Sequence, residues 1–208
     1  MKNLKRIAIL IVFLKVAFAI QSFSQKPESV LTPENANEAR LNRLQPPDQV
    51  MDAIGIKPGM VVAEIGAGKG RYVVQLAVRV GNTGKVYAED IDAESLKYLE
   101  KRCKRWGLEN VEIILGDVID PKLPENKLDI IFIISAFHHF QDPIKLLNNA
   151  RSSLKPNGLL AIGEWLKATS SEQVKAQLIT AGYKLVRTET FLEENDMYIY
   201  IFQPNIEE

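Results

Sequence analysis

One stretch decides the fold of this 208-residue chain: Val61-Val62-Ala63-Glu64-Ile65-Gly66-Ala67-Gly68-Lys69-Gly70-Arg71. Its first half is short and apolar, which is typical of a buried strand. Its second half has a glycine at every other position, and glycines allow a tight turn and let a ligand approach the backbone without a Cβ in the way. A helix predicted over residues 70–80 follows, and the free N–H groups at its start favour a bound carboxylate or phosphate. The stretch therefore predicts a strand, a ligand-binding turn and a helix in succession.

Strands and helices alternate along the rest of the chain. The run 128–134 (LDIIFII) is almost entirely apolar and β-branched, which indicates a central strand covered on both faces. Five strand–helix units followed by a terminal hairpin predict a mostly parallel sheet with helices on both faces. The predicted strands are 60–65, 85–89, 111–115, 128–134, 158–164, 183–191 and 197–203. The predicted helices are 38–44, 49–54 with Asp48 as its cap, 70–80, 93–106, 143–154 and 171–181.

Acidic residues follow the second and third predicted strands. Asp90 comes about 20 residues after the glycine turn, where a carboxylate can accept both hydroxyls of a ribose. Asp92 is assigned to the cap of the helix that starts at Ala93. Asp117, after the third strand, offers a second carboxylate where an adenine amino group would lie. Carboxyl ends of parallel strands meet at one edge of the sheet, so we expect these acids and the glycine turn to line one cleft.

The glycine spacing distinguishes between nucleotide ligands. A dinucleotide-binding turn needs its third glycine three positions after the second, and position 71 is arginine. This departure disfavours a nicotinamide-dependent oxidoreductase. A tight strand-to-helix turn that binds no nucleotide is the structural alternative.

The same positions resemble the class I S-adenosylmethionine-dependent methyltransferases, and above all the small enzymes of the ubiquinone and menaquinone type. The resemblance runs over residues 47–202. It implies an α/β, Rossmann-like three-layer sandwich with a seven-stranded, mostly parallel sheet and an antiparallel terminal hairpin strand. It also implies S-adenosylmethionine as the cofactor, with the glycines at its methionyl end. The cofactor-binding residues that it implies are Glu64, Gly66, Ala67, Gly68, Gly70, Asp90, Ile91, Asp117, Val118 and Ser135.

The only two histidines, His138 and His139, follow the fourth predicted strand, in a run that resembles the loop beside the methyl donor. Either is a candidate general base, which methyl transfer requires only when the acceptor arrives protonated. The alternative is that they pack or cap the loop. No metal site is expected, because adjacent side chains of one loop cannot easily converge on an ion and no nearby cluster completes them.

The sequence says less about the site that binds the methyl acceptor. Little chain is left after the fifth strand for an inserted cap, so the acceptor site is either open or completed by the segment 34–48. Within that segment Arg40, Arg43 and Gln45 either reach the mouth of the cofactor site or lie on a solvated helix face. The methyl acceptor itself is not identified.

Composition excludes some partners. Lys plus Arg and Asp plus Glu both number 26, so there is no basic excess for a nucleic acid. The basic run 97–105 is interpreted as the solvated face of a helix. Cys103 is the single cysteine, which excludes an intramolecular disulfide.

The N-terminus predicts export. Basic residues precede an apolar run at 7–20 that is broken only by Lys15, and small polar residues follow up to a cleavage site near Ser24. We therefore divide the chain into a signal peptide or membrane anchor (1–24), a linker and N-terminal helix (25–46) and a methyltransferase domain (47–204). A buried N-terminal helix is the other interpretation. Export, to the periplasm for example, would separate the domain from cytosolic S-adenosylmethionine, which favours an alternative function as a non-catalytic ligand-binding or regulatory protein.

Overall fold

The computed structural model describes residues 31–205, and the description below covers the unit that begins at Pro33. The predicted signal peptide or anchor (1–24) lies outside the described residues. Within the described residues, no helix is both long and apolar enough to cross a membrane.

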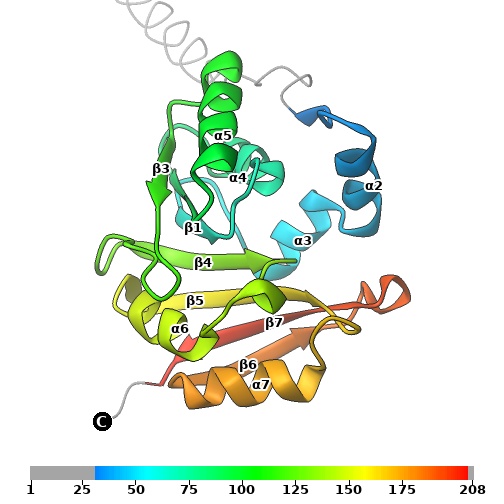
Figure 1. The fold of residues 1–208 in the computed structure, drawn as a ribbon, viewed down its shortest axis with the longest axis vertical. Helices are drawn as coiled ribbons and strands as arrows, with labels where there is room; N and C mark the ends of the chain where they lie inside the picture. Colours follow the sequence, from blue (N-terminus) through cyan, green and yellow to red (C-terminus); the bar gives the residue numbers. More distant parts are fainter. Residues whose placement is uncertain (1–30, 206–208) are drawn as a thin grey trace, which may run out of the picture. The chain divides into compact units, whose positions relative to one another are not determined.

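Seven strands form one sheet in the order β3-β2-β1-β4-β5-β7-β6 (Figure 1). Strands β1 to β5 run parallel, and β7 is antiparallel to both β5 and β6. The predicted mostly parallel sheet with an antiparallel terminal hairpin is therefore confirmed. The strands are β1 (Val61–Ile65), β2 (Lys85–Asp90), β3 (Val111–Leu115), β4 (Leu128–Ile134), β5 (Leu154–Trp165), β6 (Tyr183–Glu189) and β7 (Met197–Pro204).

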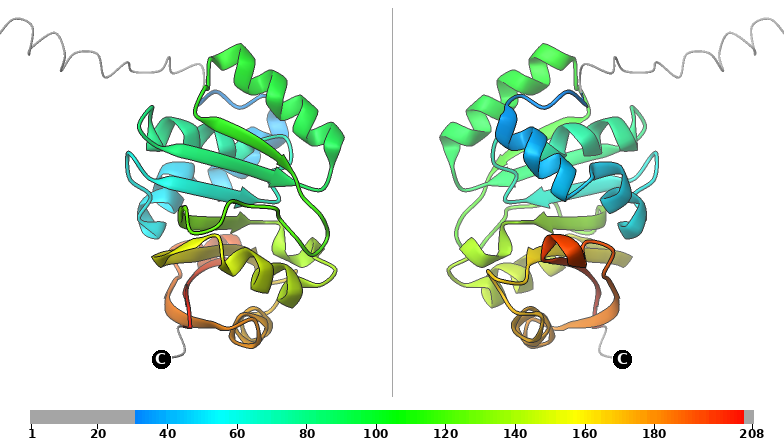
Figure 2. Two further views of the ribbon diagram at one scale, coloured as in Figure 1. Left: turned by 90° about the vertical axis from the view of Figure 1, so that its left-hand side faces the viewer. Right: turned by 90° about the vertical axis from the view of Figure 1, so that its right-hand side faces the viewer.

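Helices cover both faces of this sheet (Figure 2). The chain winds outward from β1 through α4 and α5, then returns to β4 and winds the other way through α6 and α7. Because such crossovers are right-handed, the two pairs of helices lie on opposite faces. The order reverses between β1 and β4, which is the place where open α/β sheets bind ligands. The helices are α2 (Ala36–Leu44), α3 (Pro47–Ile54), α4 (Arg71–Val80), α5 (Ala93–Trp106), α6 (Pro143–Arg151) and α7 (Ser171–Thr180).

The core is centred on β4. Every residue of this strand is buried except Asp129, as its apolar sequence predicts. The ring of Phe132 meets the ring of Tyr72 from α4 edge-on, with centroids 5.0 Å apart. On the other face, Ile131 and Ile133 belong to a cluster that also includes Leu147 of α6. Burial on both faces fixes the position of β4 and of the loop that follows it.

Three predictions about local structure are wrong. Five strand–helix units were expected, but residues 116–127 connect β3 to β4 without a helix. The helix expected over 143–154 ends at Arg151, because Leu154 pairs with Leu128 and so begins β5. Asp48 does not cap α3: the helix begins at Pro47 without a side-chain cap, and Asp48 forms an ion pair with Arg79 at 2.9 Å.

The basic run 97–105 is helical as expected, but only part of it is solvated. Lys104 is 73% exposed, whereas the side chain of Arg102 is 1% exposed. Helical periodicity turns these neighbouring residues to different faces, so a cationic run alone does not show which of its members face solvent.

Truncating the central strand should lower the free energy of unfolding by about 2–5 kcal/mol in Ile131→Ala, because a cavity remains in a fully buried site. The matched control is Ile179→Ala on α7, where the side chain is 62% exposed and the expected change is within about 0.5 kcal/mol. Urea unfolding followed by circular dichroism measures both. Equal losses in the two variants would contradict this description of the core.

Candidate functional site

An open cleft with a volume of about 240 Å³ lies at the carboxyl ends of β1, β2, β3 and β4. It gathers residues from four strand ends, as the sequence predicted. Its lining includes predicted residues from every one of these ends: Gly66, Asp90, Ile91, Asp117, Val118, Ser135 and His139. It also includes Ile65 of the predicted glycine motif, Ala136, Phe140 and Gln141 of the loop predicted to lie beside the methyl donor, and two residues that were not predicted, Glu89 and Leu146. Glu64, Ala67, Gly68, Gly70 and His138 do not line this cleft.

The glycine turn brings the end of β1 close to its neighbours. The N–H groups of Gly66 and Ala67 both donate to the carbonyl of Glu89 on β2, at 2.9 and 2.8 Å. Gly66 has φ +79°, and a Cβ there would lie 2.6 Å from the Cβ of Ala136, just beyond β4. Gly70 has φ +81°, and a Cβ would lie 2.2 Å from Leu99 of α5. A larger residue at Gly66 would push the ends of β1 and β4 apart, and a larger residue at Gly70 would push α5 away from the turn.

Asp90 connects the glycine turn to the second strand. Its Oδ2 accepts the N–H of Gly68 at 2.7 Å and its Oδ1 accepts the N–H of Asp92 at 2.8 Å. A carboxylate has about four acceptor positions, so each oxygen of Asp90 retains capacity for another donor. Asp92 caps α5 as predicted, accepting from the N–H of Glu94 at 3.1 Å and the hydroxyl of Ser95 at 2.6 Å.

The far end of the cleft combines apolar and acidic side chains. Ile91 is 56% exposed although it is apolar, and it lies beside the cleft with Val118. Asp117 is held in a turn, where its N–H donates to the carbonyl of Asp120 at 2.7 Å and its Oδ1 accepts the N–H of Val118 at 2.7 Å. This end can therefore receive a flat apolar group that carries a hydrogen-bond donor.

Two buried carboxyl groups lie under the cleft. Glu64 is 3% exposed, and burial raises its pKa to about 8, against the opposing effect of Arg71 and with a further increase from Asp90. Among the described residues, Glu64 Oε2 has no hydrogen-bond partner. Glu89 is 2% exposed, and burial followed by the charge of Asp90 raises its pKa to about 8 as well. Buried acidic groups held near neutrality are typical of functional sites.

Glu89 was not among the site residues predicted from the sequence. The signal available was an acid inside an otherwise apolar strand, directly before Asp90. The position of its side chain depends on Gly116, directly after β3, where a Cβ would overlap the Glu89 carboxylate at 1.8 Å. That contact follows from the pairing of β2 with β3, which the sequence does not specify.

The two histidine side chains lie in different surroundings. Glu164, 1% exposed at the end of β5, accepts from the backbone N–H of His138 at 3.1 Å, and its Oε1 lies 2.9 Å from His138 Nδ1. The same oxygen accepts the N–H of Trp165 at 2.7 Å. His139 lines the cleft instead, and its ring centroid lies 3.9 Å from that of His138. Glu164 was also missed, and its only signal was an acid at a strand end.

The C-terminal end of α2 reaches the cleft. Gln45 is fully buried, and its Nε2 donates to the hydroxyl of Ser135 at 2.8 Å. Ser135 itself has φ +54°, an uncommon conformation for a non-glycine residue, directly after β4. Arg40 and Arg43 are exposed and stay on the solvated face of the helix. Of the three candidates in this segment, only Gln45 contacts a cleft residue.

Within residues 31–205, no group of three His, Cys, Asp or Glu side chains lies close enough together to hold a metal ion.

Comparison with known proteins agrees with this geometry. The chain is 29% identical to a demethylmenaquinone methyltransferase of Geobacillus stearothermophilus over 110 residues, which cover 53% of this chain and 47% of the relative. It is 28% identical to the ubiquinone/menaquinone biosynthesis C-methyltransferase UbiE of Escherichia coli over 153 residues, which cover 73% of this chain and 61% of the relative. The chain thus spans about half to three fifths of these relatives.

A solved structure and a family description extend the match. The crystal structure of a SAM dependent methyltransferase from Aquifex aeolicus superposes with a TM-score of 0.73 at 29% identity, covering 80% of this chain and 96% of the other. Residues 56–203 match the family described as a methyltransferase domain. Because this match includes all seven strands and the cleft at their reversal, the chain belongs to the class I S-adenosylmethionine-dependent methyltransferase family.

Proposed function

We propose that this protein transfers a methyl group from S-adenosylmethionine to a small acceptor that loses a proton in the reaction. The observation that carries the proposal is the single cleft that brings Gly66, Asp90 and Asp117 together from three strand ends. Family membership supplies the identity of the methyl donor. The residues around the cleft fit both ends of S-adenosylmethionine.

The nucleoside end would occupy the cleft between β2 and β3. The free acceptor positions of Asp90 suit two ribose hydroxyls, and the exposed side chain of Ile91 suits the apolar face of adenine. Asp117 would accept from the adenine amino group, with Val118 beside the ring. Covering Ile91 would also remove an exposed apolar surface from water, which favours binding.

The methionyl end would lie at the glycine turn. Glu64 offers a buried carboxylate oxygen without a partner, and a ligand ammonium group would provide the missing hydrogen bond and charge. Arg71, the first residue of α4, is close enough to oppose the raised pKa of Glu64 and would attract a ligand carboxylate. Gly66, Ala67, Gly68 and Gly70 contribute backbone rather than side chains here.

When bound, S-adenosylmethionine supplies an electrophilic methyl group for an in-line displacement. The contribution of this chain is to hold donor and acceptor in line at close range, which in favourable systems is worth up to about 7–11 kcal/mol. Of the two candidate bases we propose His138: its ring does not line the cleft, but the ring centroid lies 3.9 Å from that of His139, which does. Glu164 engages Nδ1, which leaves Nε2 on the other side of the ring as the basic nitrogen.

The proposed base, His138, indicates which class of acceptor should be tested. An acceptor that arrives protonated, such as a phenol or hydroquinone, needs a general base. By their names, one relative is a demethylmenaquinone methyltransferase and the other a C-methyltransferase of ubiquinone and menaquinone biosynthesis. We therefore place reduced quinones and related phenols first among acceptors to test. A non-catalytic ligand-binding protein would bind the donor and methylate none of them.

The ribose assignment predicts that Asp90→Ala weakens binding of S-adenosylhomocysteine at least tenfold, because hydrogen bonds to a charged group contribute about 1.5–3 kcal/mol each. Titration calorimetry measures the dissociation constant. Asp92→Ala is the matched control: it removes the cap of α5 and lowers stability, but it should leave the affinity unchanged. Equal affinities of Asp90→Ala and the unaltered protein would refute the assignment.

Glu64→Gln should stabilise the ligand-free protein and weaken its binding of the cofactor. The folded state keeps a proton on Glu64 up to about pH 8, whereas the unfolded state loses it near 4.5, so the unaltered protein loses stability as pH rises through this window. The variant lacks this loss. Its free energy of unfolding, compared with that of the unaltered protein at the same pH, should therefore rise by up to a few kcal/mol between about pH 5 and pH 8.

Urea unfolding at pH 5, 6.5 and 8 gives the difference between Glu64→Gln and the unaltered protein, in which the contributions of other groups cancel. Titration calorimetry with S-adenosylhomocysteine supplies the second measurement. A stability difference that does not change with pH would show that Glu64 is not held protonated. Undiminished cofactor affinity would show that Glu64 does not contact the ligand.

His138→Ala and Glu164→Gln should both lower kcat by about 10²–10⁴ with a hydroquinone or phenol acceptor, while the dissociation constant of S-adenosylhomocysteine stays the same. Nitrogen NMR of the histidine rings provides a check that needs no acceptor: neutral His138 should carry its proton on Nδ1, and Glu164→Gln should change this tautomer balance. Unchanged turnover in His138→Ala would remove this residue from the mechanism.

A further inference from the structure

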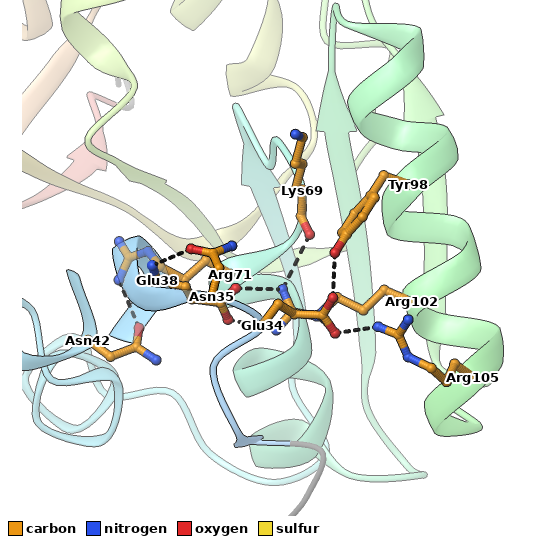
Figure 3. A network of polar contacts seen from close by, with 9 residues as sticks. All are labelled: Glu34, Asn35, Glu38, Asn42, Lys69, Arg71, Tyr98, Arg102 and Arg105. Carbon is orange, nitrogen blue, oxygen red and sulfur yellow. Dashed lines mark hydrogen bonds and ion pairs between the residues drawn. The ribbon is translucent and has the colours of Figure 1, made fainter. Parts of the chain in front are cut away.

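A buried arginine joins α2, α5 and the glycine turn (Figure 3). Arg102 of α5 is 1% exposed, and its guanidinium meets both carboxylate oxygens of Glu38 on α2, with Nη2–Oε1 at 2.6 Å and Nη1–Oε2 at 3.2 Å. Its Nη1 also donates to the carbonyl of Lys69 in the glycine turn at 3.3 Å. One side chain therefore holds α2, α5 and the glycine turn together.

Glu34 reinforces the same contact at the start of α2. One of its carboxylate oxygens lies 3.5 Å from Arg102 Nε and also pairs with Arg105, and the other accepts from the hydroxyl of Tyr98. Burying charged groups is costly, and a well-packed apolar pair is often as stable as a buried ion pair. The distinctive effect of this arrangement is the fixed geometry of a planar, bidentate contact.

The C-terminal end of α2 is also held by hydrogen bonds, through Gln45. The side-chain oxygen of Gln45 accepts from Arg71, its nitrogen donates to Ser135, and its backbone carbonyl accepts from the hydroxyl of Tyr72 at 3.0 Å. Arg71 begins the helix that follows the glycine turn, and Asn42 of α2 accepts from it as well, at 3.3 Å. The buried amide thus bridges the two sides of the cleft, from the turn after β1 to Ser135 after β4.

We propose that α2 is a component of the methyl-donor site, with Arg102 and Gln45 as positioning residues. Arg102 would hold the carbonyl side of the glycine turn, and Gln45 would hold Arg71 and Ser135 in the conformation that receives the ligand. This inference rests on the proposed function. It assigns a binding role to residues 34–45, which precede the region 56–203 that matches the family.

The competing explanation is that α2 only covers the domain. In that case, substitutions at its two contacts would lower stability but leave the affinity of the folded protein unchanged. The affinity for S-adenosylhomocysteine, measured well below the unfolding temperature, separates the two explanations because it reports only on folded molecules.

The main experiment is titration calorimetry of the full-length protein with S-adenosylhomocysteine. The double variant Glu38→Met/Arg102→Met removes both buried charges at once, so neither remains unpaired and the fold should persist. Gln45→Met keeps a similar volume and removes both side-chain hydrogen bonds. We expect the dissociation constant to rise at least tenfold in each, and to stay within twofold in the controls Arg43→Met on exposed α2 surface and Lys104→Met on exposed α5 surface.

Hydrogen exchange provides a test without any variant. If α2 belongs to the donor site, S-adenosylhomocysteine should slow amide exchange in residues 36–44 of the unaltered protein at least tenfold. Affinities within twofold of the unaltered protein in the folded variants, or unchanged exchange in α2, would overturn the inference. Absence of binding to the unaltered protein would instead contradict the proposed function itself, so the two failures are distinguishable.

Discussion

The structure depends on the close approach of β1 to β4 at the point where the strand order reverses. Gly66 makes this approach possible, since a side chain there would overlap Ala136 beyond β4. The two strands otherwise pair in parallel from Val62 to Glu64 and are buried, so their ends have no freedom to separate. The cleft forms because the chain then leaves in opposite directions, toward α4 on one face and α6 on the other. A ligand placed there meets backbone from both strands.

Two buried carboxyl groups at the cleft make folding less favourable when they are charged. Glu64 and Glu89 are almost completely buried, and each has a pKa raised to about 8 because the surroundings disfavour the charged form. A chain selected only for stability would place apolar or amide side chains at these positions. Their presence at one end of one sheet indicates a site prepared for a charged and polar ligand. The carboxylate of the nearby Asp90 accepts two backbone N–H groups.

The N-terminal helix changes how the domain is delimited. The family match begins at residue 56, yet the side chain of Gln45 is buried against Ser135, and Asn195 in the turn before β7 donates to the carbonyl of Leu44 at 3.0 Å. The end of α2 therefore contacts both the cleft loop and the terminal hairpin. The expectation that the acceptor site is either open or completed by the segment 34–48 stays a prediction.

Local sequence determined the parts of this protein that short-range physics controls. Strands β3 and β4 begin and end as their apolar runs predict, α5 begins after the Asp92 cap, and the glycine turn has the positive φ angles that its composition implies. Periodicity, capping and glycine conformation act over a few residues, so they can be read directly from the order of side chains. The convergence of Gly66, Asp90 and Asp117 follows from the same reasoning, because parallel strands bring their carboxyl ends to one edge.

Tertiary structure alone decided which of the remaining polar residues belong to the site. Gln45 and Ser135 are 90 positions apart, and Glu38 and Arg102 are 64 apart, so no local pattern connects them. Arg102 resembles its exposed neighbours in sequence and is buried only because α2 lies over that turn of α5. Glu164 became the partner of His138 through the pairing of β4 with β5. Such contacts depend on the register and packing of distant elements, and these are fixed only when the whole core assembles.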